Sequence, residues 1–131
     1  MIQLLLFSEN TTTNTRLKNI LKAEGIDTNI SDSSSPEKTL QTLSRTKFDM
    51  VVLETANQSI NYLKLLQKIK MLHPSVPVLM LSMDNTRTFA LQAMRLNAHG
   101  FLTKDSMGLE LADAVKSIRL GRCYMTTALT A

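Results

Sequence analysis

The sequence predicts an α/β fold, a doubly wound parallel sheet of five strands with helices on both faces. Short apolar runs alternate with segments of helical period along the whole chain. The runs are continuous and do not alternate in polarity, which is typical of strands buried on both faces. The 131 residues, 44% of them apolar, suit one compact domain. Such alternation of strands and helices favours a parallel sheet with right-handed crossovers.

The first third of the chain predicts two strands, each followed by a helix. IQLLLF, residues 2–7, is the first strand, and Asn10 or Thr11 is expected to cap a helix that ends near Ala23. A weaker strand, residues 26–31, follows. Next comes Ser35, which can cap the second helix because the proline and glutamate after it suit the first helical turn.

The middle of the chain predicts two strands that are apolar throughout. MVVL, residues 50–53, is the centre of the third strand, with Glu54 at its carboxyl end and a polar loop over residues 55–58. The helix after it spans about 59–72 and ends before Pro74. PVLMLS, residues 77–82, is the fourth strand.

The last third predicts one more strand between two helices. A helix near residues 86–96 leads to FLTK, residues 101–104. The last helix runs from about Ser106 to Leu120, with Leu109 and later apolar residues at helical spacing, and it ends at a glycine.

Composition excludes several classes of protein. Fifteen Lys and Arg against eleven Asp and Glu give a net charge of +4, but the basic residues are scattered and do not by themselves predict contact with nucleic acid. Cys123, the only cysteine, excludes an internal disulfide and favours a reducing compartment. The opening MIQLLLF is too short for a signal peptide core or a membrane span, so a cytoplasmic protein is expected.

Polar side chains follow or end four of the predicted strands. Ser8 and Glu9 follow the first, Glu54 ends the third, Ser82 ends the fourth and Lys104 ends the last. The carboxyl ends of parallel strands meet at one edge of a sheet, where open α/β sheets bind ligands. We therefore expect carboxylates, a hydroxyl and an ammonium group in one crevice.

These residues and their surroundings resemble the response regulator receiver domain. Within that family, they resemble the receivers of LuxR/NarL-type transcription regulators. The resemblance covers almost the whole chain and is most specific in LQAMRLNAHGFLTKD, where every gap of the family pattern is preserved. Other matching segments are LLLFSEN, VVLE, VPVLMLS and SIRLGRCYMTTALT. It implies the flavodoxin-like (βα)5 receiver fold and a non-enzymatic signalling module.

The resemblance also implies roles for individual residues. In the family, carboxylates hold Mg²⁺, an aspartate accepts a phosphoryl group, and a hydroxyl and an ammonium group neutralise its oxygens. The matching positions are the acidic pair Ser8 and Glu9, the phosphoacceptor Glu54, the switch hydroxyl Ser82, the switch aromatic Phe101 and the phosphate-binding Lys104. Phe101 is equally well explained as a core aromatic.

Several positions depart from the family pattern. Ser8 in place of an acid removes one negative charge, so Mg²⁺ is expected to bind weakly to Glu9 and Glu54, or not at all. Glu54 in place of Asp moves the carboxylate outward by roughly 1.5 Å, and a misplacement of about 1 Å can cost on the order of a hundredfold in rate. Gln58 and Tyr62 stand where the family has Pro and Gly.

These departures suggest that Glu54 is a fixed negative charge that imitates a phosphorylated aspartate. Its longer side chain can approach Lys104 and Ser82, which would favour an active-like state without a kinase. Two alternatives remain for Glu54: a purely structural pair with Lys104, or a receiver that still takes up a phosphoryl group with Mg²⁺. A flavodoxin-like cofactor binder is less favoured because SENTTTNT lacks the glycines of a phosphate loop.

The resemblance gives an expected domain organisation and expected partners. Residues 1–122 are expected to form the receiver domain, and residues 123–131 to begin a linker toward a DNA-binding output domain that this chain does not contain. The chain is then expected to be a fragment of a longer regulator, with a stand-alone receiver as the alternative. A homodimer is expected, with a histidine kinase or another regulator as a further partner. No membrane contact and no direct contact with nucleic acid are expected for this domain.

Overall fold

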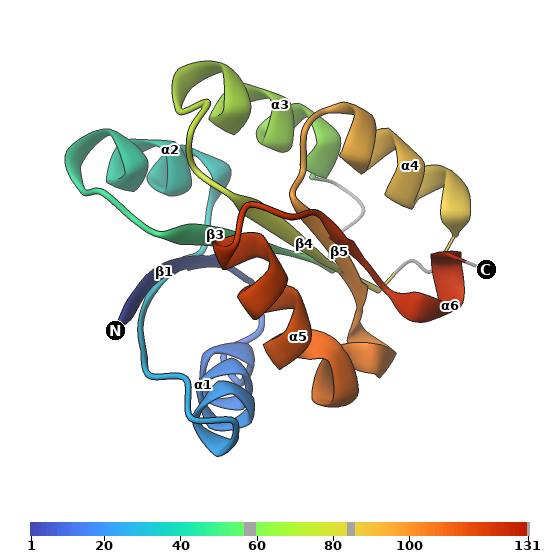
Figure 1. Cartoon of the computed structure of the whole chain (residues 1–131). Coiled ribbons are helices and arrows are strands. Elements are labelled where there is room, and N and C mark those ends of the chain that lie inside the picture. Colours follow the sequence, from blue (N-terminus) through green and yellow to red (C-terminus); the bar gives the residue numbers. More distant parts are fainter. Residues whose placement is uncertain (57–59, 84–85, 131) are drawn as a thin grey trace.

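The computed structural model describes residues 1–56, 60–83 and 86–130, and its strands form one parallel sheet (Figure 1). The strand order is β2-β1-β3-β4-β5-β6. The described strands are β1 (Ile2–Phe7), β2 (Thr28–Ser33), β3 (Met50–Thr55), β4 (Val78–Ser82), β5 (Gly100–Thr103) and β6 (Tyr124–Met125). The predicted doubly wound sheet is confirmed, but the prediction of five strands is wrong, because β6 extends the sheet beside β5.

Helices cover both faces of the sheet, with α1 and α5 on one face and α2, α3 and α4 on the other (Figure 1). A short 3₁₀ turn, η1, joins β5 to α5. The helical segments are α1 (Thr13–Ala23), α2 (Pro36–Arg45), α3 (Tyr62–Leu72), α4 (Arg87–Arg95), η1 (Lys104–Ser106), α5 (Met107–Arg119) and α6 (Thr127–Thr130).

The continuous apolar runs supply two separate cores. Leu4 and Leu6 of β1 pack with α1 and α5, whereas Leu5 and Phe7 pack with the helices of the opposite face. Successive side chains of a strand point to opposite faces, so a strand covered on both sides needs apolar residues at every position. β3 follows the same rule, and all six of its residues are buried.

Helix boundaries follow local capping more closely than apolar spacing. Ser35 caps α2 as predicted and accepts a hydrogen bond from the Lys38 backbone (3.1 Å). Asn61 caps α3 in the same way, so this helix begins at Tyr62, later than the predicted 59. The prediction for residue 59 itself, like that for Gln58, lies outside the described residues.

The inner face of α5 is the expected one except at Leu109. Leu109 is 90% exposed, whereas Met107, Leu111, Val115 and Ile118 are buried against the sheet. These buried residues lie at helical spacing offset from Leu109, which places Leu109 on the opposite side of the helix.

The end of the described chain packs onto the β5 edge. Gly100 and Phe101 pair in parallel with β6, and the Thr126 backbone N–H donates to the Phe101 carbonyl (2.8 Å). The Thr126 hydroxyl accepts from the Thr103 N–H (2.9 Å) and is buried. The segment therefore continues the sheet.

Over the described residues, the longest helices are too short and too polar to cross a bilayer.

Candidate functional site

The carboxyl ends of the strands bring several of the predicted residues together. Glu54 is the last residue but one of β3 and is only 3% exposed. Ser8 follows β1 directly, Ser82 ends β4, and Lys104 is the first residue after β5. Because β1, β3, β4 and β5 are consecutive in the sheet, these side chains share one edge, as the sequence predicted.

Glu54 is held by a cation and two hydroxyl groups. Its Oε2 atom lies 3.0 Å from Lys104 Nζ. Thr13 Oγ1 lies 2.9 Å from each carboxylate oxygen and donates to them, and Ser8 Oγ donates to Oε1. A buried carboxylate is costly unless it is paired and hydrogen-bonded, and here both conditions are met.

Thr13 is the member of the site that the sequence did not predict. It is the first residue of α1, is 3% exposed, and reaches Glu54 from 41 residues away in the chain. A threonine at a helix start is commonly a cap, so its type gave no separate signal. A useful sign would have been that the helix start follows β1, whose end lies beside β3.

Ser82 is linked to β3 through a neighbouring hydroxyl. Thr55 Oγ1 donates to Ser82 Oγ (3.2 Å) and accepts from the Met83 backbone N–H (3.3 Å). Both side chains are buried. Thr55, expected in a polar loop, is instead the last residue of β3.

Phe101 is fully buried in the core between the sheet and α2, α3 and α4. Its ring meets that of Phe89 from α4 edge-on, with 5.7 Å between the centroids and 79° between the planes. This is a favourable aromatic geometry. Packing therefore accounts for the position of Phe101, and its role as a switch stays a prediction.

The residues present do not fit a resident Mg²⁺ ion. Receiver domains typically bind Mg²⁺ weakly through several carboxylates, whereas the Glu54 oxygens already accept from Ser8, Thr13 and Lys104. Glu9 is exposed and lines a hollow of about 310 Å³ that also includes Asp32. In the part of the chain that is described, no three His, Cys, Asp or Glu side chains gather as metal ligands. A hard cation prefers more free oxygen donors than this site offers.

The model of the response regulator receiver domain matches residues 4–116 of the chain. The protein belongs to this family. As a receiver domain, it has the family's sheet and places its polar residues at the edge where the family's phosphoryl chemistry takes place.

Curated relatives are longer than this receiver. The glycerol metabolism activator of Pseudomonas putida is 29% identical over 77 residues, which are 59% of this chain and 35% of that protein. The transcriptional regulatory protein DegU of Brevibacillus brevis is 21% identical over 129 residues, which are 98% of this chain and 55% of that protein. The chain thus spans a third to about half the length of these relatives.

Solved structures with the same fold include LuxR-family response regulators. One from an Aurantimonas species has a TM-score of 0.87 at 19% identity, covering 99% of this chain and 93% of that one. The isolated REC domain of RcsB from Salmonella enterica has a TM-score of 0.85 at 13% identity, covering 99% and 96%. A structure of two RcsB dimers bound to two parallel DNAs has a TM-score of 0.84 at 13% identity, covering 98% and 66%.

Proposed function

We propose that this receiver belongs to a LuxR-type response regulator and acts without phosphorylation, with Glu54 as a built-in substitute for phosphoaspartate. The observation that carries the proposal is the ion pair between the buried Glu54 carboxylate and Lys104, 3.0 Å apart. Lys104 stands at the position whose family counterpart binds the phosphoryl group. Here the carboxylate of Glu54, a residue of the chain itself, already pairs with the Lys104 ammonium group.

The surroundings of Glu54 favour a fixed charge over a reactive one. A nucleophile must present a free lone pair to the incoming phosphorus in line with the leaving group. The Glu54 carboxylate instead accepts hydrogen bonds from Ser8 and Thr13 while it pairs with Lys104. Phosphorylation would have to break these contacts and expose a group that is 3% accessible.

The contacts of Lys104 suggest how the charge influences the rest of the domain. Lys104 directly follows β5, the strand that holds Phe101 and pairs with β6. A carboxylate that keeps Lys104 in place therefore also favours one position of the end of β5. In this proposal that edge of the sheet is permanently in an active-like arrangement.

We infer that the output is a protein interface. The relatives are transcription regulators, and the solved neighbours include RcsB dimers on DNA. By this likeness, the receiver forms a homodimer in the cytoplasm and controls a DNA-binding domain in the full-length regulator. Receiver domains are generally not catalytic enzymes, and no turnover is proposed. A histidine kinase is not required for this mode of action.

Intact mass spectrometry after incubation with acetyl phosphate and Mg²⁺ tests the proposal. The parent protein is run beside Glu54→Asp, which shortens the side chain by one methylene group and restores the family acceptor. We expect no adduct on the parent; an adduct on Glu54→Asp alone would show that the acceptor residue by itself prevents phosphorylation, and no adduct on either would show that the acid missing at Ser8 also matters. A phosphoryl adduct on the parent, lost in Glu54→Gln, would show that Glu54 is an acceptor and would overturn the proposal.

A further inference from the structure

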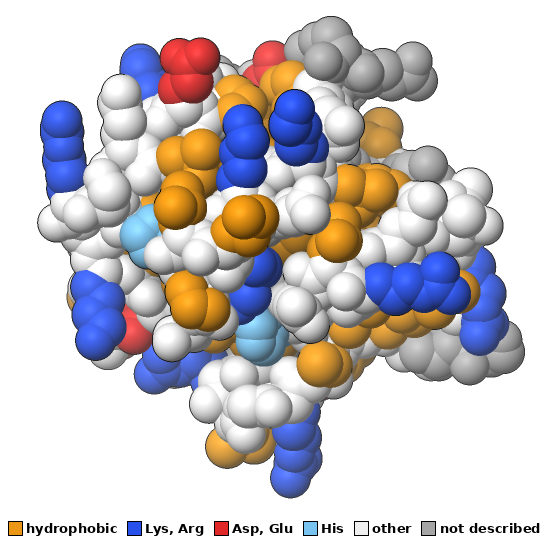
Figure 2. All heavy atoms as spheres, turned by 90° about the horizontal axis from the view of Figure 1, so that it is seen from above, with side chains coloured by type: hydrophobic (Ala, Val, Ile, Leu, Met, Phe, Trp, Pro, Cys, Tyr) orange, Lys and Arg blue, Asp and Glu red, His pale blue; other side chains and the backbone are white. Residues whose placement is uncertain are grey.

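The face formed by α2, α3 and α4 is basic and also carries apolar side chains. Figure 2 shows orange and blue side chains interleaved over the centre of this face, with red side chains at its margin. The ion pairs Lys104–Glu54 and Arg119–Asp49 of the described residues involve none of the five exposed cations around α3. The exposed cations around α3 are Arg45, Lys47, Lys64, Lys68 and Arg95.

Large apolar side chains are exposed among these cations. Met71 and Leu72, in the last turn of α3, are 74% and 64% exposed, and Leu91 of α4 is 38% exposed. Isolated exposed apolar residues are common on protein surfaces, but a group with a polar rim commonly marks an interaction site. Here the group and its rim lie on adjacent helices.

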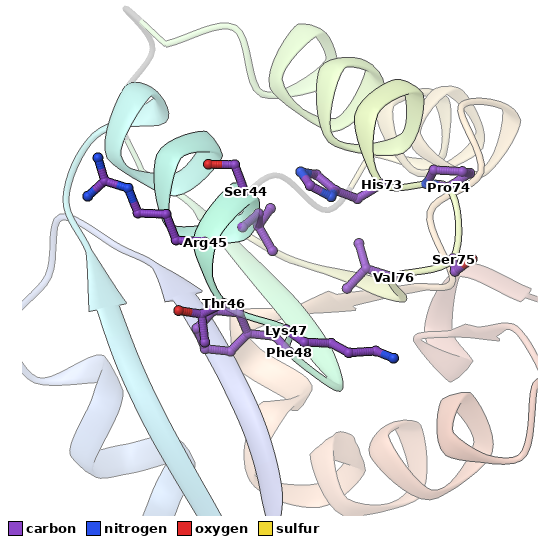
Figure 3. Close-up of a pocket in the computed structure, with 10 residues that line it drawn as sticks. Ser44, Arg45, Thr46, Lys47, Phe48, His73, Pro74, Ser75 and Val76 are labelled. Atoms are coloured by element: carbon purple, nitrogen blue, oxygen red, sulfur yellow. The ribbon is translucent and has the colours of Figure 1, made fainter.

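Three hollows adjoin the end of α3. The largest, about 490 Å³, lies between the connection from α2 to β3 and the connection from α3 to β4 (Figure 3). In Figure 3 the imidazole of His73 extends from the end of α3 toward Ser44 of α2, and Lys47 runs below Val76.

The two smaller hollows lie on the other side of the end of α3. One of about 330 Å³ is lined in part by Lys70 and His99. The other, about 240 Å³, lies between α3 and α4 and is lined in part by Met71 and Arg95. The exposed apolar side chains thus stand between recesses with basic walls.

We propose that this face binds an acidic protein segment that carries apolar side chains. Carboxylates of the segment pair with the cations around α3. This charge complementarity selects acidic partners and raises the association rate. Apolar side chains of the segment cover Met71 and Leu72 and enter the adjoining hollows, which contributes the hydrophobic part of the affinity.

A protein segment fits this surface better than nucleic acid does. A phosphate backbone would satisfy the cations but would leave the exposed apolar side chains of α3 uncovered. The largest hollow lies where the chain enters β3 and β4, at the opposite end of these strands from Glu54. Binding here is therefore independent of the proposed role of Glu54.

Selection from a random 16-residue peptide display library tests the proposal. The parent protein is the target, and the variant Lys68→Glu/Arg95→Glu is used for counter-selection. We expect enriched peptides to carry a net negative charge together with several apolar residues. If no peptide is enriched, or if the enriched peptides lack an excess of Asp and Glu, the proposal is wrong.

Fluorescence anisotropy with the most enriched peptide then locates the site. We expect Lys68→Glu/Arg95→Glu and Met71→Ser/Leu72→Ser each to weaken binding about tenfold, a loss typical of important interface residues. Salt should weaken binding to the parent, since exposed charges are screened. The matched controls are Lys18→Glu/Lys22→Glu on α1 and Leu109→Ser on α5, which change exposed residues of the other face.

Three outcomes of the anisotropy measurements would overturn the proposal. If the α1 and α5 controls weaken binding as much as the α3 and α4 variants, the peptide is attracted to the whole protein surface and not to the proposed face. If Met71→Ser/Leu72→Ser binds like the parent, the face recognises charge alone. If a 20-base-pair duplex binds more tightly than the peptide and is lost with Lys68→Glu/Arg95→Glu, the face is a nucleic-acid site.

Discussion

Glu54 is a buried carboxylate with one cation and two hydroxyl groups around it. The longer side chain lets the carboxylate contact Lys104 while Ser8 and Thr13 donate to it. In the proposed function this negative charge takes the place of the charge that a phosphoryl group would bring. The cost of burying this charge is offset only while the partners stay in place.

Removing the cation should therefore destabilise the domain more than removing both charges. Because Glu54 is 3% and Lys104 18% exposed, we expect Lys104→Met to lower the free energy of unfolding by about 2 kcal/mol, between the values for exposed and buried pairs. Adding Glu54→Gln should recover part of this loss. Urea denaturation of the four proteins of this cycle measures the coupling. If Lys104→Met lowers the free energy of unfolding equally in the parent and in Glu54→Gln, the two charges do not interact.

The sequence predicted the pair of Glu54 and Lys104 but not the hydroxyl groups around it. Both charged residues lie at the carboxyl ends of apolar strands in one parallel sheet, and this topology alone places them at one edge. Ser8 was expected to matter only through the charge it lacks, yet its hydroxyl donates to Glu54. The contact of Thr13 with Glu54 depends on the exact residue at which α1 starts. Apolar spacing in the sequence predicts that residue only to within a few positions.

At the scale of elements, α5 and the end of the described chain are joined through one carboxylate. Glu110 Oε1 accepts from the Tyr124 hydroxyl (2.7 Å) and from the backbone N–H and hydroxyl of Thr127 (2.9 and 2.8 Å). Burial alone would raise the pKa of Glu110, but these hydrogen bonds lower it below the ordinary 4.5. Burial and Glu110 together raise the pKa of Tyr124 to about 12.

This anchor should be lost in acid. A carboxyl group whose pKa is lowered by folding contributes stability above its unfolded value, and that contribution disappears as pH falls through the lowered pKa. We expect the Thr127 amide resonance to titrate at a pH below 4.5, and the protection of the segment's amides against exchange, relative to an unfolded chain at the same pH, to fall as the segment loosens. NMR of Glu110→Gln should show no such titration and a Tyr124 pKa below 12 but above 10, because burial remains.

Asp113→Asn is the control for this prediction, since Asp113 is exposed on the same helix. It should leave the Thr127 titration unchanged and lower the pKa of Tyr124 only slightly, because the charge of Asp113 is the last and smallest of the causes that raise that pKa. A titration of Thr127 that persists in Glu110→Gln would mean that another group anchors the segment.

The elements that the sequence predicted best are those with long apolar runs. β1 matches its predicted range, whereas β2 begins two residues later than expected, because the Ile26 N–H is bonded to Leu21 at the end of α1. β6 could not be predicted from its two residues, since it exists only through pairing with β5. Tyr124 and Met125 are adjacent apolar residues, but the tail CYMTTALTA around them has no strong pattern.

At the scale of the whole molecule, the sheet has two chemically different ends. The carboxyl ends of the strands hold the Glu54 cluster, and the amino ends of β3 and β4 adjoin the largest hollow beside the basic face. The two proposed interfaces, one governed by the charge at Glu54 and one for an acidic segment, therefore lie far enough apart to be occupied at once.

The proposed active-like state has a consequence for self-association. If the Glu54 charge sets the arrangement of the β5 edge, its removal should change the equilibrium between monomer and dimer, since a switch acts only through unequal interaction with two states. We expect Glu54→Gln to weaken dimerisation by about fivefold or more, within the usual range of coupling between sites. Analytical ultracentrifugation of the parent, Glu54→Gln and Glu24→Gln, an exposed glutamate with the same change, measures this effect. Equal dimerisation constants for all three proteins would leave Glu54 as a structural partner of Lys104 and remove the mimic.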